Sequence, residues 1–339
     1  MNHFSWKQHI IDINQYKEDL DNLIKNYKKS EYCTYQNNIP EYDLDKLDLD
    51  DQNILKDIYT QFFDETGCLI LKNVYSEKTM MEYNTWCEYM LNYCKDDENL
   101  RHPKQKNKLL INDVIGRMSE NDIDLLLSLI NNKNLNLITD NLLGFSKIGS
   151  CTCHWIEPNG ERQLSHVDYP IHLGSGKFWK NDVNNVKKLT TKYQLNKILP
   201  YYSLQALIAS DQMDIRNGST EVVPFSHRLP DIDINIHNEE IYNFFEKLFV
   251  NVKLNQGDVL LFNRRLCHRG GFNGSSYRRN SLIIQYVWLW GIGQELIDDK
   301  NVFKNLEKSE KYTHLSEEEK KYFKLKLKSP YPTDVKKNA

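Results

Sequence analysis

A histidine and an aspartate stand two positions apart, at His166 and Asp168, in the stretch SHVDYP. On an extended strand, residues two apart project from the same face, so these side chains could share one metal ion. Ser165 cannot complete a hydrolytic triad with them, because neighbouring strand residues point to opposite faces. No G-x-S-x-G turn surrounds any serine of the chain. Such a pair often arises by chance, and an ordinary surface or core pair stays an open alternative.

A further candidate ligand, His268, follows the apolar run VLLF in the stretch 257–288. Two histidines and one carboxylate form the facial triad that binds non-haem Fe(II) and leaves coordination positions open. Arg279 begins the next apolar segment, and Ser281 stands on the same face two residues later. An arginine and a hydroxyl at the mouth of such a site can hold a carboxylate by charge-assisted hydrogen bonds. The sequence therefore combines candidate metal ligands with a candidate anion site.

The elements that must position these residues change character at about residue 144. Upstream, apolar residues with helical spacing predict two helices within 1–60, around a loop that contains Pro40, and another helix from Ser76 through Cys94. Short apolar or alternating segments, bounded by Gly, Pro, Asn and Asp, predict strands at 67–76, 146–157, 202–210, 219–227, 257–263 and 279–290. The series from 146 onward suggests an antiparallel sandwich or barrel. A capping box at Ser316 and Glu319 predicts a C-terminal helix outside this β core, ending before Pro330.

Composition excludes several classes of protein. The 339 residues carry a net charge of −3 with 27% charged residues, so no global positive field attracts nucleic acid. An aromatic content of 12% is too high for a disordered chain. The seven cysteines are scattered, the first residues lack a secretory pattern, and no apolar run spans a bilayer. We expect a cytoplasmic protein with reduced thiols that acts on a small molecule, without nucleic acid or membrane; a monomer and a homodimer are both open.

Four segments together resemble the phytanoyl-CoA dioxygenase family of Fe(II)- and 2-oxoglutarate-dependent oxygenases. They are FFDETGCLILKNVYSEKTM (62–80), SHVDYP (165–170), LQALIASDQMDIRNGSTEVVPFSHRLP (204–230) and GDVLLFNRRLCHRGGFNGSSYRRNSL (257–282). Their combined order and spacing are far more specific than any one of them. We expect an α+β fold with a mainly β core: a double-stranded β-helix, of jelly-roll or cupin-like form, buttressed by N-terminal and C-terminal helices. One domain would cover 1–339, with a helical extension at 1–60, the jelly-roll core at 144–292 and a helical tail at 293–339.

The resemblance also implies roles for individual residues. It assigns the iron to three ligands, His166, Asp168 and His268. Arg279 would bind the distal carboxylate of 2-oxoglutarate, with Ser281 as a second donor. Arg278 competes for that role, but it faces the opposite side of the predicted strand, and the spacing from His268 favours Arg279. His227 is expected to be structural, in a phrase where Phe225 replaces the family's more usual glycine.

The implied reaction uses Fe(II), 2-oxoglutarate and O2 to oxidise an unactivated C–H bond, with release of succinate and CO2. Hydroxylation, desaturation and oxidative cyclisation all remain open. Related halogenases carry Gly or Ala where Asp168 stands, which leaves room for chloride. A carboxylate at this position therefore indicates oxygenation or oxidation.

Residues near the motifs are candidates to line a substrate pocket: Trp155, Arg162, Gln163, Tyr169, His172 and Gln205. Simple strand packing or surface exposure is an alternative for each. Positive charges at Arg162, His172, Lys177 and Arg265 favour an anionic metabolite or natural-product intermediate, and an acyl-CoA remains possible. The polar stretch 174–201 has no clear periodicity and is typical of a lid.

Other interpretations of the chain stay open beside this one. Cys151, Cys153 and His154 could suggest zinc, but no second cysteine pair follows, so buried strand residues are expected. A cupin-like metalloenzyme that does not use 2-oxoglutarate would give Arg279 no role. A non-catalytic binding protein on the same scaffold would be expected to lose at least one ligand, whereas the set is intact.

Overall fold

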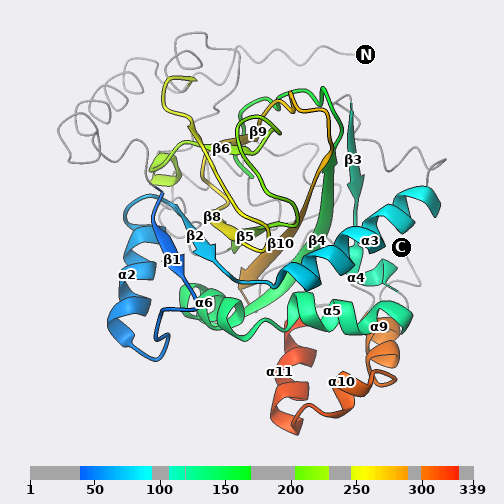
Figure 1. Cartoon of the computed structure of the whole chain (residues 1–339). Helices are drawn as coiled ribbons and strands as arrows, with labels where there is room; N and C mark the ends of the chain where they lie inside the picture. The colour runs from blue at the N-terminus through cyan, green and yellow to red at the C-terminus, as the bar shows by residue number, and fades with distance from the viewer. Residues whose placement is uncertain are drawn as a thin grey trace, which may run out of the picture. The chain divides into compact units, whose positions relative to one another are not determined.

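The computed structural model describes residues 39–93, 107–118, 120–168, 203–228, 246–288 and 299–327. The chain divides into two units, Met1–Ile39 and Pro40–Ala339, and every element below belongs to the second. The first helix expected within 1–60 and the lid expected at 174–201 lie outside the described residues. Figure 1 shows the arrangement of the remaining elements.

The larger of two sheets has seven strands in the order β1-β2-β8-β5-β10-β4-β3. Its strands are β1 (Glu41–Asp43), β2 (Cys68–Lys72), β3 (Lys108–Ile111), β4 (Ser146–Ile156), β5 (Ser203–Ala209), β8 (Val259–Asn263) and β10 (Arg279–Trp288). The pairs are antiparallel except β1 with β2, which is parallel. The central strands β5 and β8 are buried along their whole length, as their aliphatic runs predict.

The smaller sheet has the order β7-β6-β9, from β7 (Val250–Asn251), β6 (Thr220–Val222) and β9 (His268–Gly270). The strand predicted over 219–227 is shorter than expected. Pro224 cannot donate to a ladder, and Phe225 has a positive φ of 68°, so the chain turns into the short helix η8 (Ser226–Arg228). An isolated bridge between His166 and His268 adds the segment before Asp168 to this sheet beside β9. Two sheets facing each other confirm the predicted double-stranded β-helix.

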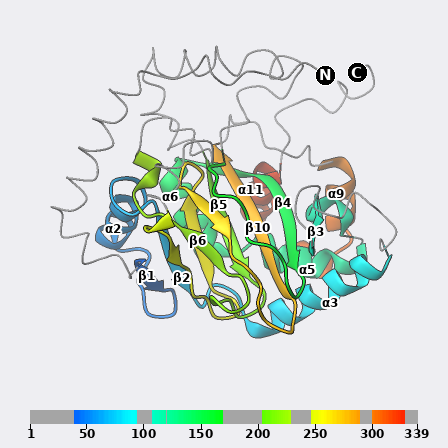
Figure 2. The same cartoon turned by 90° about the horizontal axis from the view of Figure 1, so that it is seen from above.

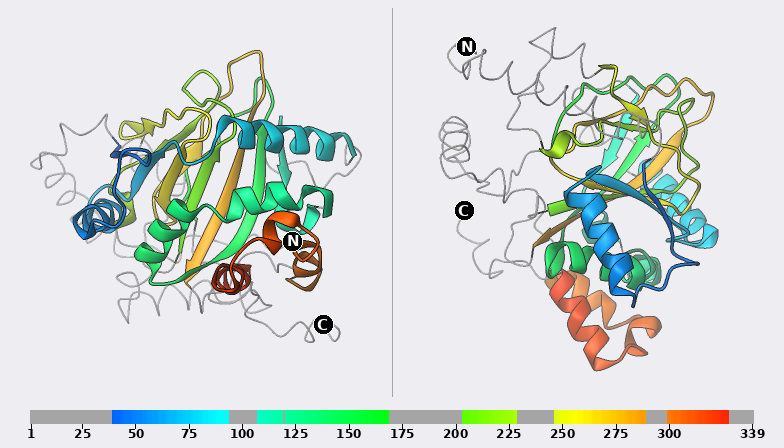
Figure 3. Two further views of the ribbon diagram at one scale, coloured as in Figure 1. Left: turned by 60° about the horizontal axis from the view of Figure 1, so that its bottom comes forward. Right: turned by 90° about the vertical axis from the view of Figure 1, so that its left-hand side faces the viewer.

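Helices cover the outer face of the large sheet, on the side away from the small sheet (Figures 1 and 2). The helices on this side are α2 (Gln52–Phe63), α3 (Glu77–Tyr93), α4 (Val114–Arg117), η4 (Glu120–Asp122), α5 (Ile123–Ile130), α6 (Lys133–Leu143), α9 (Asp299–Leu306), α10 (Glu310–Thr313) and α11 (Glu317–Leu327). Of these, α9 packs on α4 and α10 packs on α5. Figure 3 shows α5, α6 and α11 lying against this face. Among the described residues, none of these helices is both long and apolar enough to cross a membrane.

The predicted helix starts are confirmed by their capping contacts. The backbone N–H of Thr79 donates to Ser76 Oγ over 3.2 Å at the start of α3. At the start of α11, the N–H of Glu319 donates to Ser316 Oγ over 3.2 Å, and Glu319 Oε2 accepts from the Ser316 N–H over 2.9 Å. This reciprocal pair is the predicted capping box.

A buried ion pair joins the C-terminal helix to α6, and a hydrogen bond from the same lysine reaches β4 of the large sheet. Lys326 of α11 is only 1% exposed, and its ammonium lies 2.6 Å from Asp140 Oδ1 and 2.7 Å from Ser146 Oγ. The rings of Phe145, Tyr286 and Tyr322 surround the cation. Burial lowers the pKa of Lys326 to about 8, against the opposing effect of Asp140. The lysine therefore depends on this carboxylate to remain charged inside the protein.

We predict that Asp140→Asn lowers the free energy of unfolding by about 3–5 kcal/mol, because the buried Lys326 must then either stay charged without its counter-charge or give up its proton. Urea denaturation followed by circular dichroism measures the change. Lys133→Met is the matched control, since it breaks an ion pair with Glu319 in which Lys133 is 79% exposed. That pair should contribute no more than about 1 kcal/mol. Equal losses in the two variants would contradict the role given to Asp140.

Candidate metal centre

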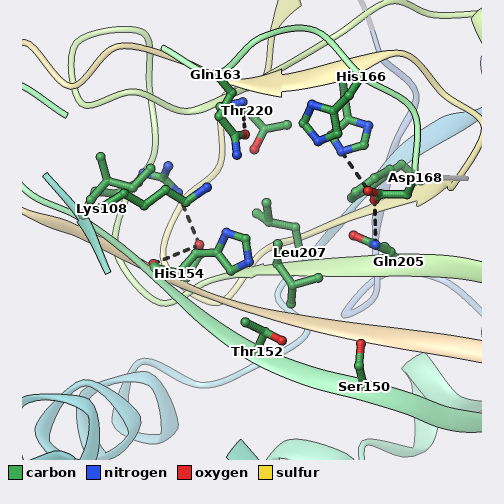
Figure 4. Close-up of a pocket in the computed structure, with 17 residues that line it drawn as sticks. Lys108, Ser150, Thr152, His154, Gln163, His166, Asp168, Gln205, Leu207 and Thr220 are labelled. Carbon is green, nitrogen blue, oxygen red and sulfur yellow. Dashed lines mark hydrogen bonds and ion pairs between the residues drawn. The ribbon is translucent and has the colours of Figure 1, made fainter. Parts of the chain in front are cut away.

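Three side chains with metal-binding atoms meet between the two sheets. The donor atoms of His166, Asp168 and His268 all lie within 4.8 Å of one another. His268 Nε2 is 3.5 Å from Asp168 Oδ2, and the two imidazole rings have centroids 4.4 Å apart. Figure 4 shows His166 and Asp168 on the same side of the cavity, as their spacing on extended backbone predicts.

The backbone holds this cluster together. The His166 N–H donates to the carbonyl of His268 over 3.0 Å, and the His268 N–H donates to the carbonyl of His166 over 2.9 Å. His268 stands in β9, which pairs with β6, so the segment that carries Asp168 is fixed to the small sheet. Residues distant in sequence therefore share one short stretch of antiparallel ladder.

Each histidine presents the same ring nitrogen to the cluster. Nδ1 of His166 lies 2.8 Å from the carbonyl of Leu164, and Nδ1 of His268 lies 2.9 Å from the carbonyl of Leu266. A carbonyl can only accept, so Nδ1 carries the proton and Nε2 keeps its lone pair. Such a backbone contact fixes the tautomer and the orientation of metal-ligating imidazoles.

Burial and hydrogen bonding set the protonation of the cluster. Burial first, and the neighbouring His166 second, lower the pKa of His268 to about 4. His268 is therefore neutral near pH 7, which is the form that ligates a metal. Asp168 Oδ2 accepts a hydrogen bond from Gln205 Nε2 over 2.7 Å. A hydrogen bond from outside the cluster thus orients its carboxylate.

The cluster faces a cavity of about 160 Å³ over the inner face of the large sheet. Residues of β3, β4, β5, β8 and β10 form its floor: Lys108, Ser150, Thr152, His154, Ile156, Gln205, Leu207, Phe262, Arg279, Ser281 and Ile283. Gln163, Thr220 and Gly270 line it from the side of the small sheet. Figure 4 shows Ser150 and Thr152 on the wall opposite His166 and Gln163.

Two cations occupy one end of this floor. Arg279 is 2% exposed; it donates to the carbonyl of Gly218 over 2.9 Å and to Ser281 Oγ over 3.3 Å. Its Nε has no hydrogen-bond partner among the described residues. Lys108 shares its register, since both pair with Ile156 on β4. Within the described parts of the chain, neither cation forms an ion pair with a carboxylate, so this end of the cavity suits an anion.

Burial lowers the pKa of both Arg279 and Lys108. It lowers the pKa of Arg279 to about 10, which still leaves the guanidinium charged near pH 7. Burial, and then the charge of Arg279, lower the pKa of Lys108 to about 7, against the opposing effect of Asp168. Lys108 is thus poised between its charged and neutral forms at neutral pH.

The alternation of strand β10 separates the two competing arginines. Arg279 points into the cavity, whereas Arg278 is half-exposed, with Nε 3.7 Å from Glu157 Oε2 and its guanidinium 4.9 Å from the Trp155 ring centroid. Arg279 and Ser281 both line the cavity at this end, and their role in binding 2-oxoglutarate stays a prediction.

The candidates for the substrate pocket fall into three groups. Gln163 and Gln205 line the cavity. Trp155 does not: it packs in the core beneath the sheet, because Ser150, Thr152, His154 and Ile156 take the inner face of β4 and leave residue 155 on the outer one. Arg162 is half-exposed and pairs with Glu221 Oε1 at 3.2 Å, outside the cavity lining. The expected roles of these two residues were therefore wrong, and Tyr169 and His172 lie outside the described residues.

The sequence did not single out Lys108, Ser150 or Thr152 as site residues. The alternating pattern of 146–157 contained the signal for Ser150 and Thr152, because both share a face with His154. Lys108 begins a four-residue strand whose pairing with β4 nothing in the local sequence reveals.

Cys151 and Cys153 are buried, as expected for ordinary strand residues. His227 is also buried, with Nε2 lying 3.0 Å from the carbonyl of Phe63. Its contact agrees with the structural role predicted for it.

Several solved structures share this fold. The non-haem alpha ketoglutarate dependent epimerase SnoN of nogalamycin biosynthesis is 17% identical, with a TM-score of 0.52 over 70% of this chain and 82% of SnoN. The carbocyclase SnoK of the same biosynthesis is 17% identical, with a TM-score of 0.53 over 77% of this chain and 91% of SnoK. EctD from S. alaskensis, solved with bound Fe, is 16% identical, with a TM-score of 0.52 over 70% of this chain and 78% of EctD. At these identities the likeness concerns the fold.

No curated protein matches the sequence. The model of the family described as phytanoyl-CoA dioxygenase (PhyH) matches residues 63–281. That range is more than half of the chain. It contains the His166, Asp168 and His268 cluster, and also Lys108 and Arg279, the two cations of the anion end of the cavity. This chain therefore belongs to the phytanoyl-CoA dioxygenase family, whose members are oxidoreductases of the dioxygenase type.

Proposed function

We propose that this protein is an Fe(II)- and 2-oxoglutarate-dependent dioxygenase that oxidises an unactivated C–H bond of a small molecule. One observation carries the proposal: a cluster of two histidines and one carboxylate faces a buried arginine, which has no acidic partner among the described residues, across one cavity. The first group suits non-haem iron and the second suits a carboxylate. SnoN has been solved in complex with Fe3+, alpha ketoglutarate and nogalamycin RO, which supports the same pair of cofactors here.

The donor set fits iron in number, type and protonation. His166, Asp168 and His268 would hold the ion through two imidazole nitrogens and one carboxylate oxygen. Both imidazoles are fixed by backbone carbonyls, so the Nε2 lone pairs are available without rearrangement. Iron, when bound with 2-oxoglutarate and O2, supplies the oxidation of the C–H bond and the release of succinate and CO2.

The anion end of the cavity would hold 2-oxoglutarate. Arg279 offers an unpartnered Nε–H, and its Nη1 already lies beside the Ser281 hydroxyl. Because the guanidinium is buried, its attraction for a carboxylate is weakly screened. Lys108 adds a second ammonium at the same register. These groups would select a dicarboxylate and fix its orientation relative to the ligand cluster.

The remaining lining residues would position the substrate and limit the access of water. Leu207, Phe262 and Ile283 give the cavity apolar walls. With a metal bound, Asp168 would take the coordination position that a halide would need. This arrangement supports oxygenation or a related oxidation, and hydroxylation, desaturation and ring closure all remain candidates. SnoN and SnoK both act in nogalamycin biosynthesis, which supports a natural-product intermediate as the substrate.

Succinate formation tests the proposal. The purified chain, supplied with Fe(II), 2-oxoglutarate and O2, is expected to release succinate, detected by mass spectrometry, and to stop when either iron or 2-oxoglutarate is omitted. Arg279→Gln should raise the KM for 2-oxoglutarate at least roughly 30-fold, since a buried charge-assisted contact contributes about 2 kcal/mol or more. Arg278→Gln is the matched control and should leave KM unchanged. Turnover that survives without 2-oxoglutarate, or that ignores Arg279→Gln, would favour a metalloenzyme of another kind.

Lys108 should make the binding of 2-oxoglutarate depend on pH. Its pKa of about 7 means that it is charged below pH 7 and increasingly neutral above it. A bound dianion favours the charged form, so binding above pH 7 takes up a proton. The Kd should therefore rise with pH, by up to about tenfold per unit above neutrality.

Calorimetric titration of the Mn(II)-loaded protein with 2-oxoglutarate measures this dependence. Lys108→Arg is the matched control, because a guanidinium stays charged throughout the range and should flatten the profile. An unchanged slope in Lys108→Arg would assign the pH dependence to another group.

A further inference from the structure

Neutral polar side chains form a row across the large sheet, at the end of the cavity away from the two cations. Gln285 of β10 pairs in register with Ser150 of β4 on one side and with Gln205 of β5 on the other. Ser150 and Gln205 both line the cavity. Along β10, positions 279 and 285 are separated by about 20 Å of strand. The row and the anion end are therefore distinct parts of one floor.

Hydrogen bonds fix which atoms of this row face the cavity as acceptors. Gln205 donates through Nε2 to Asp168 Oδ2 over 2.7 Å, and the reverse orientation of the amide would set two oxygens against each other. Gln205 Oε1 is thus left as an acceptor. The Ser150 hydroxyl donates to Gln285 Oε1 over 3.2 Å, which leaves the lone pairs of its oxygen to accept as well. Figure 4 shows Ser150 and Gln205 on the floor of the cavity, with Gln205 beside Asp168.

The charges around the row also favour a neutral substrate group at this end of the cavity. Among the described residues that line the cavity, the lysine and the arginine are Lys108 and Arg279, and both stand at the opposite end. Arg264, whose charge interacts with that of Asp168, is not part of the lining. Of the described residues that line the cavity beside the row, Asp168 carries the charge, as a carboxylate. A substrate carboxylate placed there would meet another carboxylate and two acceptor oxygens, which disfavours its charged form.

We propose that Ser150 and Gln205 form a substrate subsite, with the fully buried Gln285 fixing the Ser150 hydroxyl, and that the part of the substrate reaching it is uncharged and carries hydroxyl or amide N–H donors. Leu207, Phe262 and Ile283 lie beside the row and would hold the carbon skeleton whose C–H bond is presented to the cluster. The inference rests on the proposed function, because that function reserves the cationic end for 2-oxoglutarate. The sequence had suggested an anionic substrate, and the inference instead places a neutral substrate group at this end. Arg162 does not support an anionic group here, because it pairs with Glu221 outside the cavity.

Ligand-detected NMR tests the subsite without turnover. The full-length protein, loaded with Zn(II) and saturated with 2-oxoglutarate, is offered three sets of probes of similar size. One contains hydroxyl donors, as methyl glycosides and cyclitols; one contains neutral amides; one contains hydroxy acids and amino acids. Saturation transfer is expected for one or both neutral sets and not for the carboxylates. The first two sets distinguish hydroxyl from amide donors.

Variants then locate the binding. Ser150→Ala should lower the affinity for the neutral probe about fivefold, the effect of losing one neutral hydrogen bond. Saturation transfer to 2-oxoglutarate itself should persist. Ser128→Ala, on α5 and away from the cavity, is the matched control and should change nothing. Persistent 2-oxoglutarate binding in each variant shows that the cavity is intact.

Three results would overturn the subsite: carboxylate probes that bind and are weakened by Ser150→Ala, neutral probes that bind both proteins equally, or neutral probes that all fail to bind. Failure of the proposed function has a different signature. In that case 2-oxoglutarate gives no saturation transfer to the unmodified protein, while the neutral probes still report on the row.

Discussion

The reciprocal pair of backbone hydrogen bonds between His166 and His268 is the constraint on which the site depends. It binds the segment that carries two candidate ligands to the strand that carries the third, at 3.0 and 2.9 Å. Strand geometry then brings both imidazoles and the carboxylate of Asp168 to one face. The large sheet supplies the opposite wall, and its outer helices bury the apolar residues that keep it in place. A side chain alone could not hold the cluster; the pairing of two strand segments does.

The inner face of the large sheet carries different polar side chains at the two ends of the cavity. Buried cations stand at one end, with Arg279 anchored by a carbonyl and a hydroxyl, and neutral amides and hydroxyls stand at the other. Burying Arg279 and Lys108 without acidic partners among the described residues costs stability, as expected for groups reserved for a ligand. Gln205 connects the two halves of the site, because it belongs to the floor and hydrogen-bonds Asp168. The same residue thus orients a candidate metal ligand and shapes the space for substrate.

Local sequence was sufficient wherever strand alternation decides the geometry. It predicted that His166 and Asp168 share a face and that Arg279, rather than Arg278, enters the cavity. The same alternation over 146–157 excludes Trp155 once His154 is known to face inward, so that error came from treating nearness in sequence as nearness to the site. Most of the predicted strands were confirmed, and the exception at 219–227 follows from Pro224 and the positive φ of Phe225. Lys108 and the pairing of Arg162 with Glu221 depend on contacts between segments far apart in the chain, which periodicity cannot reveal.

The central claim is that one cavity binds iron and 2-oxoglutarate together. Anaerobic titration of the Fe(II)-loaded protein with 2-oxoglutarate tests it most directly, through the weak visible charge-transfer absorption of the iron chelate. We expect this band to grow to saturation at one 2-oxoglutarate per chain and to be absent from folded His268→Ala protein. A protein that develops no band, or a band that is undiminished in His268→Ala, would contradict the claim.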